Sequence, residues 1–293
     1  MESKQLPGIK RNVSLEEFTT FRIGGKAKYF FVAKNEKDLI EAVKFVKDNK
    51  LPFFIFGGGS NLLVSDGEFK GIVIKTQNRK LESRNSRIIA ESGTLLGKIV
   101  QLSVKKGLTG LEWASGIPGT VGGAVYGNAG WPSNQKNIAS AVEWVRVLEI
   151  KPKFKIKNYR TRDCKFGYRD SVFKHKSSLI ILSVCLRLKK GDINEIKREI
   201  SEILKKRREK TPAFFSAGSI FKNPKSFPAG YLIEKCGLKG KKVGQAKISE
   251  KHANFIINLG GAKAKDVKSL INLAKKEVKK KFKISLEEEI QFL

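Results

Sequence analysis

The chain is poor in the residues that form cross-links or bind metals, with three cysteines and two histidines among 293 residues. Cys164, Cys185 and Cys236 are odd in number and widely spaced, so neither a disulfide framework nor a zinc site fits them, and we expect no bound metal. The most apolar stretch, 179–188, is far shorter than the ~20 residues that a membrane-spanning helix needs. The first seven residues contain no apolar run behind their charges, so we expect no secretory signal and a cytoplasmic, reducing compartment.

Acidic residues are also scarce: 28 Asp and Glu stand against 59 Lys and Arg, which gives a net charge of +31. Residues 1–150 carry 22 basic and 14 acidic residues (22 − 14 = +8), and residues 151–293 carry 37 and 14 (37 − 14 = +23). Such a field attracts anions, whether phosphorylated ligands or nucleic acid. The alternative interpretation is a lysine-rich, solvated surface with no particular partner.

Helical and extended patterns divide the chain. Apolar residues at helical spacing predict helices at 36–49, 94–106, 192–210, 229–236 and 266–281. Short apolar or β-branched runs predict strands at 52–56, 72–74, 88–90, 141–150, 179–188 and 284–293. After Gly191 the predicted elements change from mostly strands to mostly helices, which indicates a domain boundary. We place a further subdivision of the first part of the chain near residue 76. We therefore expect three domains, at 1–76, 77–190 and 191–293.

Two glycine-rich segments lie in the first half. Gly57-Gly58-Gly59-Ser60-Asn61-Leu62 follows a predicted strand, but it matches neither the dinucleotide fingerprint nor a P-loop. Ser115 to Ala124 is rich in small residues and contains a proline, a composition that is costly in a helix or strand interior. Free backbone N–H groups in such loops suit an elongated, phosphate-bearing ligand. Paired structural turns remain the alternative.

The second half offers Ser219 after Ala217-Gly218, with Lys222 and Asn223 close by. Such a serine is a candidate nucleophile or proton donor, although a serine after glycine is more often a turn or a helix cap. The spacing shows no Ser-His-Asp triad.

Seven collinear motifs carry a resemblance over nearly the whole chain. They are Thr19-Thr20-Phe21-Arg22-Ile23-Gly24-Gly25, Gly57 to Val64, Ser115 to Ala124, Phe166-Gly167-Tyr168-Arg169-Asp170-Ser171, Arg207-Arg208-Glu209-Lys210, Ser216 to Pro224 and Ser249-Glu250-Lys251-His252-Ala253. Together they resemble the UDP-N-acetylenolpyruvoylglucosamine reductase family of peptidoglycan precursor synthesis. The short interval from Ser219 to Glu289 resembles the family's form that lacks a Tyr-bearing substrate loop.

The resemblance implies an α+β fold, with a two-part FAD-binding region of the vanillyl-alcohol oxidase type and a C-terminal α+β substrate domain. It implies non-covalent FAD, with NADPH as the electron donor and the enolpyruvyl double bond of a UDP-sugar as the acceptor. We also expect a monomer with no nucleic-acid or membrane partner. The residues that the resemblance assigns to FAD are Gly57, Gly58, Gly59, Ser60, Asn61, Leu62, Ser115, Gly116, Pro118, Gly119, Thr120, Gly122 and Gly123.

The resemblance also assigns catalytic roles. Arg169 matches the residue that stabilises the enolate-like intermediate, Ser219 the proton donor and Glu289 the catalytic glutamate. Hydride addition leaves negative charge on the substrate, which preorganised donors and cations stabilise. The residues that match substrate or NADPH contacts are Tyr168, Lys210 and Asn223.

The sequence departs from the family pattern in three places. Glu288 stands where a proline is frequent, Gln291 where an arginine is common, and Trp131 to Gln135 where a smaller, glycine-rich segment is expected. Another oxidoreductase on the same fold is the nearest alternative, but the first histidine is His175, so no His-flavin bond forms in the first subdomain. A basic nucleic-acid-binding protein is the alternative from another class, supported by charge alone.

Overall fold

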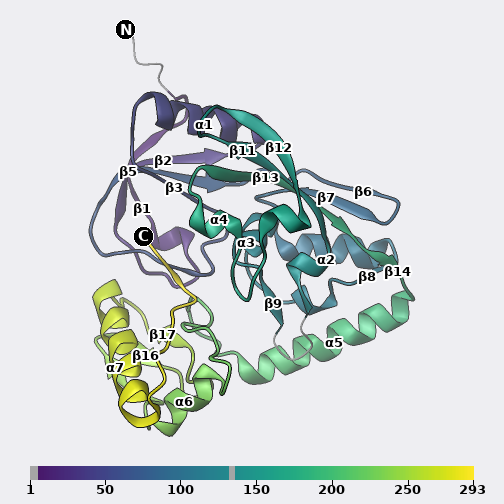
Figure 1. Ribbon diagram of the computed structural model, residues 1–293. Helices are drawn as coiled ribbons and strands as arrows, with labels where there is room; N and C mark the ends of the chain where they lie inside the picture. Colours follow the sequence, from purple (N-terminus) through teal and green to yellow (C-terminus); the bar gives the residue numbers. More distant parts are fainter. Residues whose placement is uncertain (1–5, 132–135) are drawn as a thin grey trace. The chain divides into compact units, whose positions relative to one another are not determined.

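The computed structural model describes residues 6–131 and 136–293 (Figure 1). Two predictions concern residues that lie partly outside these ranges. They are the absence of a secretory signal in the first seven residues and the departure from the family pattern at Trp131 to Gln135. The described chain forms two compact units. Unit 1 comprises the described residues within 6–9, 31–58, 73–131 and 136–207, and unit 2 comprises residues 10–30, 59–72 and 208–293.

Unit 1 is built on a five-stranded sheet in the order β12-β11-β13-β7-β6. All neighbouring strands in it are antiparallel. The bounds are β6 Leu81–Arg84, β7 Arg87–Glu91, β11 Val142–Glu149, β12 Lys155–Arg160 and β13 Leu179–Arg187. The central strand β13 is buried over most of its length, which explains the continuous apolar run in its sequence.

Helices and short strands complete unit 1. Helix α1 places Leu39, Ala42, Val43 and Val46 on one buried stripe, and the Asn35 side chain caps it by accepting from Asp38 N at 2.8 Å. The other bounds are α1 Glu36–Asp48, β3 Phe53–Phe56, α2 Leu96–Lys105, β8 Leu108–Thr109, α3 Val121–Tyr126, β9 Gly130–Trp131, β10 Lys136–Asn137, α4 Val172–His175 and β14 Lys189–Lys190.

Three elements run from one unit into the other along the chain. Strands β2 (Lys26–Ala33) and β5 (Phe69–Thr76) belong to a sheet of order β1-β2-β5-β3, where β1 is Lys10–Ser14. Helix α5, Ile193–Lys210, begins in unit 1 and ends in unit 2.

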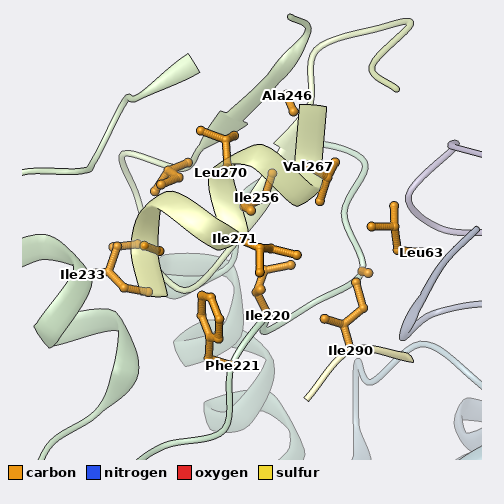
Figure 2. Packing of buried hydrophobic residues seen from close by; sticks show 14 of the residues in the cluster. Leu63, Ile220, Phe221, Ile233, Ala246, Ile256, Val267, Leu270, Ile271 and Ile290 are labelled. Carbon is orange, nitrogen blue, oxygen red and sulfur yellow. The ribbon is translucent and has the colours of Figure 1, made fainter. Parts of the chain in front are cut away.

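Unit 2 surrounds one apolar cluster (Figure 2), to which α7 contributes Val267, Leu270 and Ile271. These residues recur at helical spacing, as the sequence predicts. Ile220 and Phe221 enter the same cluster from an extended segment. The bounds are β4 Leu62–Leu63, α6 Ala229–Lys235, β15 Lys242–Val243, β16 Ala246–Ile248, β17 Ile256–Asn258, α7 Ala264–Phe282 and β18 Gln291–Phe292.

The predicted strand at 284–293 is only partly present. It reduces to β18, which pairs in parallel with β4, and to a single bridge between Glu288 and Phe221. The segment changes its pairing partner between these two contacts, so no continuous ladder forms.

Candidate active site

The two glycine-rich segments contact each other within unit 1. A Cβ atom on Gly57 would overlap Thr120 Oγ1, and one on Gly58 would lie 2.9 Å from Gly119 Cα. Thr120 also caps α3, because its Oγ1 accepts from Gly123 N at 3.3 Å. Glycine is therefore required at 57 and 58 for the loops to approach this closely.

These loops fit the phosphate-bearing cofactor that the sequence predicts. Neither 57–62 nor 115–123 contains an acidic residue that would repel an anion. Ser115 is 5% exposed, and its Oγ has no hydrogen-bond partner among the described residues. A buried hydroxyl without a partner is costly unless a ligand or water satisfies it. The remaining residues of the first loop, Gly59 to Leu62, belong to unit 2.

Arg169 lies on a tight turn in unit 1. Gly167 and Asp170 exchange both backbone hydrogen bonds, at 3.0 and 3.2 Å, and Arg169 has φ 54°. A left-handed backbone at a non-glycine residue is uncommon and marks a locally constrained position. Arg169 Nη2 donates to Gly130 O at 2.9 Å, so the guanidinium group has a defined direction.

Asn128 holds this turn in place, a role that the sequence alone did not indicate. It is 6% exposed, its Nδ2 donates to Gly167 O at 2.7 Å, and its Oδ1 accepts from Ala139 N at 3.3 Å. Ser171 Oγ donates to Tyr126 O at 2.7 Å and attaches the other end of the turn to α3. Its neighbours in the sequence, Gly127 and Ala129, gave no signal of this role.

Ser219 belongs to an extended segment of unit 2. Its neighbour Ile220 is 1% exposed and donates from its N–H to Asn254 O at 2.9 Å. Ser219 itself forms a bridge with Phe255 and is half-buried. Gly218 has φ 77°, and a Cβ there would meet nothing within 4 Å, so its backbone conformation rather than space calls for glycine.

The same segment also pairs with the end of the chain. Glu289 N donates to Ile220 O at 2.8 Å, which brings Glu289 next to Ser219. Asn61 Nδ2 donates to Glu289 O at 3.1 Å, and Gln291 N donates to Asn61 O at 3.0 Å. Three segments far apart in the sequence therefore meet in unit 2: the second half of the first glycine-rich loop, the Ser219 segment and the C-terminal strand.

The three consecutive acids have different partners. Glu287 forms an ion pair with Lys222, and Glu288 forms one with Lys275 at 2.8 Å. Glu289 is the acid whose backbone is bonded on both sides, to Ile220 and Asn61.

The three residues predicted to contact substrate or NADPH are spread over both units. Tyr168 is 53% exposed and lies in unit 1, with Arg169 Cζ 5.7 Å from its ring centroid. Asn223 lies in unit 2, where its Oδ1 accepts from Ala229 N at 3.0 Å. Lys210 is the last residue of α5 and is exposed; its charge helps to lower the pKa of His252, after the larger effect of burial.

Two further residues support the Ser219 segment and were missed in the sequence. Asn254 is 3% exposed, and its side chain makes two hydrogen bonds to the Phe221 backbone. Asn254 Nδ2 donates to Phe221 O at 2.8 Å, and Asn254 Oδ1 accepts from Phe221 N at 3.0 Å. Thr20 Oγ1 donates to Ser216 O at 2.8 Å, and Thr20 N donates to Gly59 O at 3.1 Å. Thr20 lies in a quoted motif, but its partner is 196 residues away.

The residues at 6–131 and 136–293 contain no group of three or more His, Cys, Asp or Glu side chains that could hold a metal ion. No helix in these ranges is long and apolar enough to cross a membrane.

Comparison with known proteins first defines the class. The family model of an FAD binding domain matches residues 27–151. The chain is therefore an FAD-binding protein, and the glycine-rich loops that fit a phosphate-bearing cofactor begin and end within this match.

The particular family follows from full-length relatives. The C-terminal domain of UDP-N-acetylenolpyruvoylglucosamine reductase matches residues 210–293. The reductases of Clostridium novyi (strain NT) and Caldicellulosiruptor bescii are 39% and 45% identical, over 97% and 95% of this chain and 92% and 88% of their own lengths. The crystal structure of the Thermus caldophilus enzyme is 36% identical with a TM-score of 0.83, covering 97% of this chain and 98% of that one. The chain belongs to the UDP-N-acetylenolpyruvoylglucosamine reductase family.

Family membership confirms several predictions. The fold is α+β, with an FAD-binding region followed by a C-terminal α+β region. The protein is an FAD-dependent oxidoreductase of peptidoglycan synthesis.

Proposed function

We propose that the protein reduces the enolpyruvyl group of UDP-N-acetylglucosamine enolpyruvate to give UDP-N-acetylmuramate. The two glycine-rich loops would hold FAD, which, once reduced by NADPH, would supply the hydride for the carbon of the double bond that is remote from the carboxylate. The observation that carries the proposal is the hydrogen bond from Glu289 N to Ile220 O, the residue after Ser219, in a chain that aligns along nearly its whole length with named reductases. The remaining chemistry is a proton transfer and the stabilisation of negative charge, and the chain supplies residues for both.

Ser219 is the proposed proton donor. Its hydroxyl transfers a proton to the substrate carbon next to the carboxylate. A serine hydroxyl is a weak acid, so it needs neighbouring groups and exclusion of water to act. Burial of Ile220 and Phe221 on its C-terminal side fixes the backbone that carries it. Glu289, bonded to Ile220, is the residue proposed to assist this proton transfer.

Arg169 is proposed to stabilise the negative charge that hydride addition leaves on the substrate. A guanidinium group with two parallel donors matches a carboxylate or an enolate oxygen pair. The constrained turn and the bond to Gly130 O orient this group before the charge develops. Preorganisation of that kind lowers the barrier because no reorganisation is needed during the reaction.

The residues proposed to hold FAD are Gly57, Gly58, Gly59, Ser60, Asn61, Leu62, Ser115, Gly116, Pro118, Gly119, Thr120, Gly122 and Gly123. Small side chains allow the cofactor to approach backbone N–H groups, and Ser115 Oγ offers a buried donor. Tyr168, Lys210 and Asn223 are proposed to contact the nucleotide sugar or NADPH. We further propose three domains at 1–76, 77–190 and 191–293, a monomer, cytoplasmic location and no nucleic-acid partner.

Replacement of Glu289 by Gln should lower turnover of the enolpyruvyl substrate by about 10²–10⁴-fold, because the carboxylate assists proton transfer. Glu288→Gln is the matched control: it removes the neighbouring carboxylate and breaks the Lys275 ion pair. This pair is only partly exposed and contributes about 1 kcal/mol, so the control should keep its turnover. Steady-state assays of both variants decide the assignment. A loss in Glu288→Gln that equals the loss in Glu289→Gln would contradict it.

The visible spectrum of the purified protein tests the proposed function. A yellow protein that bleaches with NADPH under anaerobic conditions, and regains its colour when the enolpyruvyl nucleotide sugar is added, is the expected result. Bleaching without recovery would indicate a related flavoenzyme with another acceptor. A protein that also fails to take up added FAD would contradict the assignment of the glycine-rich loops.

A further inference from the structure

The peptide bond between Gly57 and Gly58 is held by Lys75, a residue of β5. Strand β5 lies next to β3 in its sheet, and the first glycine-rich loop follows β3 directly. Lys75 Nζ donates to Gly57 O at 2.9 Å and lies 4.7 Å from the centroid of the Phe56 ring. The next residue of β5, Thr76, donates from its Oγ1 to Phe56 O at 3.3 Å. Two consecutive carbonyls at the start of the loop are therefore bound by side chains of β5.

The bond from Lys75 determines which way this peptide group faces. A trans peptide is planar, and its carbonyl and N–H point in opposite directions. Because Lys75 binds Gly57 O, the Gly58 N–H is directed away from Lys75. Among the described residues, this N–H donates no hydrogen bond to another backbone group. Gly58 also lies where the two glycine-rich loops meet, since a Cβ on it would come within 2.9 Å of Gly119 Cα. Its N–H is thus a donor for a ligand that these loops hold.

The same peptide group is easy to turn over when nothing holds it. Glycine on both sides lowers the cost of this rotation, because neither residue has a Cβ to restrict its backbone angles. The rotated peptide would present the Gly57 carbonyl in place of the Gly58 N–H, and a carbonyl oxygen repels a phosphate oxygen. Backbone N–H groups in a loop bind such an oxygen instead. The bond to Lys75 therefore selects the orientation that suits an anion.

We propose that Lys75 is a positioning residue, which holds the peptide between Gly57 and Gly58 so that the Gly58 N–H donates to a phosphate oxygen of FAD. The proposal rests on the proposed function, because it assumes that the two glycine-rich loops hold FAD. Lys75 acts through the backbone of the loop, from the side opposite to the donor. Its positive charge strengthens the bond to Gly57 O, because a charge-assisted hydrogen bond is stronger than a neutral one.

The affinity of the protein for FAD tests the proposal. Lys75→Met should weaken FAD binding by about 10–100-fold, because it removes a hydrogen bond from a charged donor. Lys75→Arg keeps a charged donor and should recover most of the affinity. Lys70 provides the matched control: it is exposed on the same strand, so Lys70→Met removes the same formal charge and should leave the affinity unchanged. Fluorescence titration of the full-length apoprotein with FAD measures the four dissociation constants.

The pH dependence of FAD binding separates a charged positioning group from a merely structural contact. Burial, and then the positive charge of Arg79, lower the pKa of Lys75 to about 8. An anionic ligand favours the protonated form, so FAD binding should raise this pKa. The affinity of the wild type should therefore be constant below pH 8 and fall as the pH rises above it. Lys75→Arg should show no such fall, because arginine stays protonated, and Lys75→Met should bind weakly at every pH.

Two results would overturn the role of Lys75. In the first, Lys75→Met binds FAD as tightly as the wild type; in the second, it loses as much affinity above pH 8 as the wild type does. Should Lys75→Met fail to fold, parallel pH curves for the wild type and Lys75→Arg would overturn the proposal in the same way. NADPH and the enolpyruvyl substrate take no part in these titrations. A protein that binds FAD but does not reduce that substrate therefore contradicts the proposed function alone, and one that takes up no FAD contradicts both.

Discussion

Ser219→Ala should retain NADPH-driven reduction of bound FAD and lose turnover of the enolpyruvyl substrate by about 10²–10⁴-fold. The two half-reactions separate because only the later proton transfer uses the hydroxyl. The backbone bond between Ile220 O and Glu289 N does not involve the Ser219 side chain, so the segment should keep its conformation. Stopped-flow absorbance of the flavin, first with NADPH and then with substrate, measures each half-reaction alone.

Ser216→Ala is the matched control for this prediction. Ser216 lies in the same segment, and its contact with Thr20 is made through the carbonyl rather than the hydroxyl. The control should therefore keep both half-reactions near the wild-type rates. An equal loss in the two half-reactions of Ser219→Ala would assign the hydroxyl a structural or cofactor-binding role instead.

The regular elements with strong periodicity could be predicted from the sequence. The helix expected at 266–281 is α7, Ala264–Phe282, because its apolar residues repeat at 3.6-residue spacing and enter the core of unit 2. The strand expected at 179–188 is β13, whose continuous apolar run is buried. The spacing of apolar residues is enough to predict a helix or strand when the whole element packs against one core.

The C-terminal segment shows why other features could not be predicted. Glu288 faces Phe221, whereas Gln291 pairs with Leu62, so two distant partners determine its structure. The clustering of residues 10–30 and 59–72 with the C-terminal region has the same origin, because it depends on pairings of high sequence separation. A sequence pattern contains no information on which distant segment supplies the partner.

The same distinction applies to the candidate site: the sequence identifies the candidate catalytic residues, but not the residues that position them. Motifs identified Ser219, Arg169 and Glu289 as residue types that suit the chemistry, and the roles of all three remain predictions. The residues that hold them, Asn128 and Asn254, are buried amides that bond Gly167 and Phe221, which lie 39 and 33 residues away. Nothing in their sequence neighbourhoods distinguishes such amides from exposed ones. Arg207 belongs to one of the motifs that carry the resemblance, but its partial burial and its stack on Trp131 appear only in the structure.

Arg169→Ala should keep FAD bound and reducible by NADPH, and should lower substrate reduction by about 10²–10³-fold, the usual cost of losing one preorganised group that stabilises developing charge. Arg169→Lys should recover little of the activity, because an ammonium group cannot offer two parallel donors. The ratio of flavin to protein absorbance after purification, with single-turnover oxidation of the reduced flavin by substrate, measures both parts. Loss of FAD in Arg169→Ala would make Arg169 a cofactor contact instead.

The turn itself must be separated from the guanidinium group, because Arg169 also bonds to Gly130 O and so supports β9. Lys174→Met loosens the turn without touching the guanidinium, since Lys174 Nζ donates to Arg169 O at 2.7 Å. If backbone position alone matters, Lys174→Met should reproduce most of the loss seen in Arg169→Ala. If the charge acts on the substrate, Lys174→Met should retain most of its activity while Arg169→Ala does not. We expect the second result, because the bond from Arg169 Nη2 to Gly130 O does not involve Lys174 and keeps the guanidinium group directed when the turn loosens.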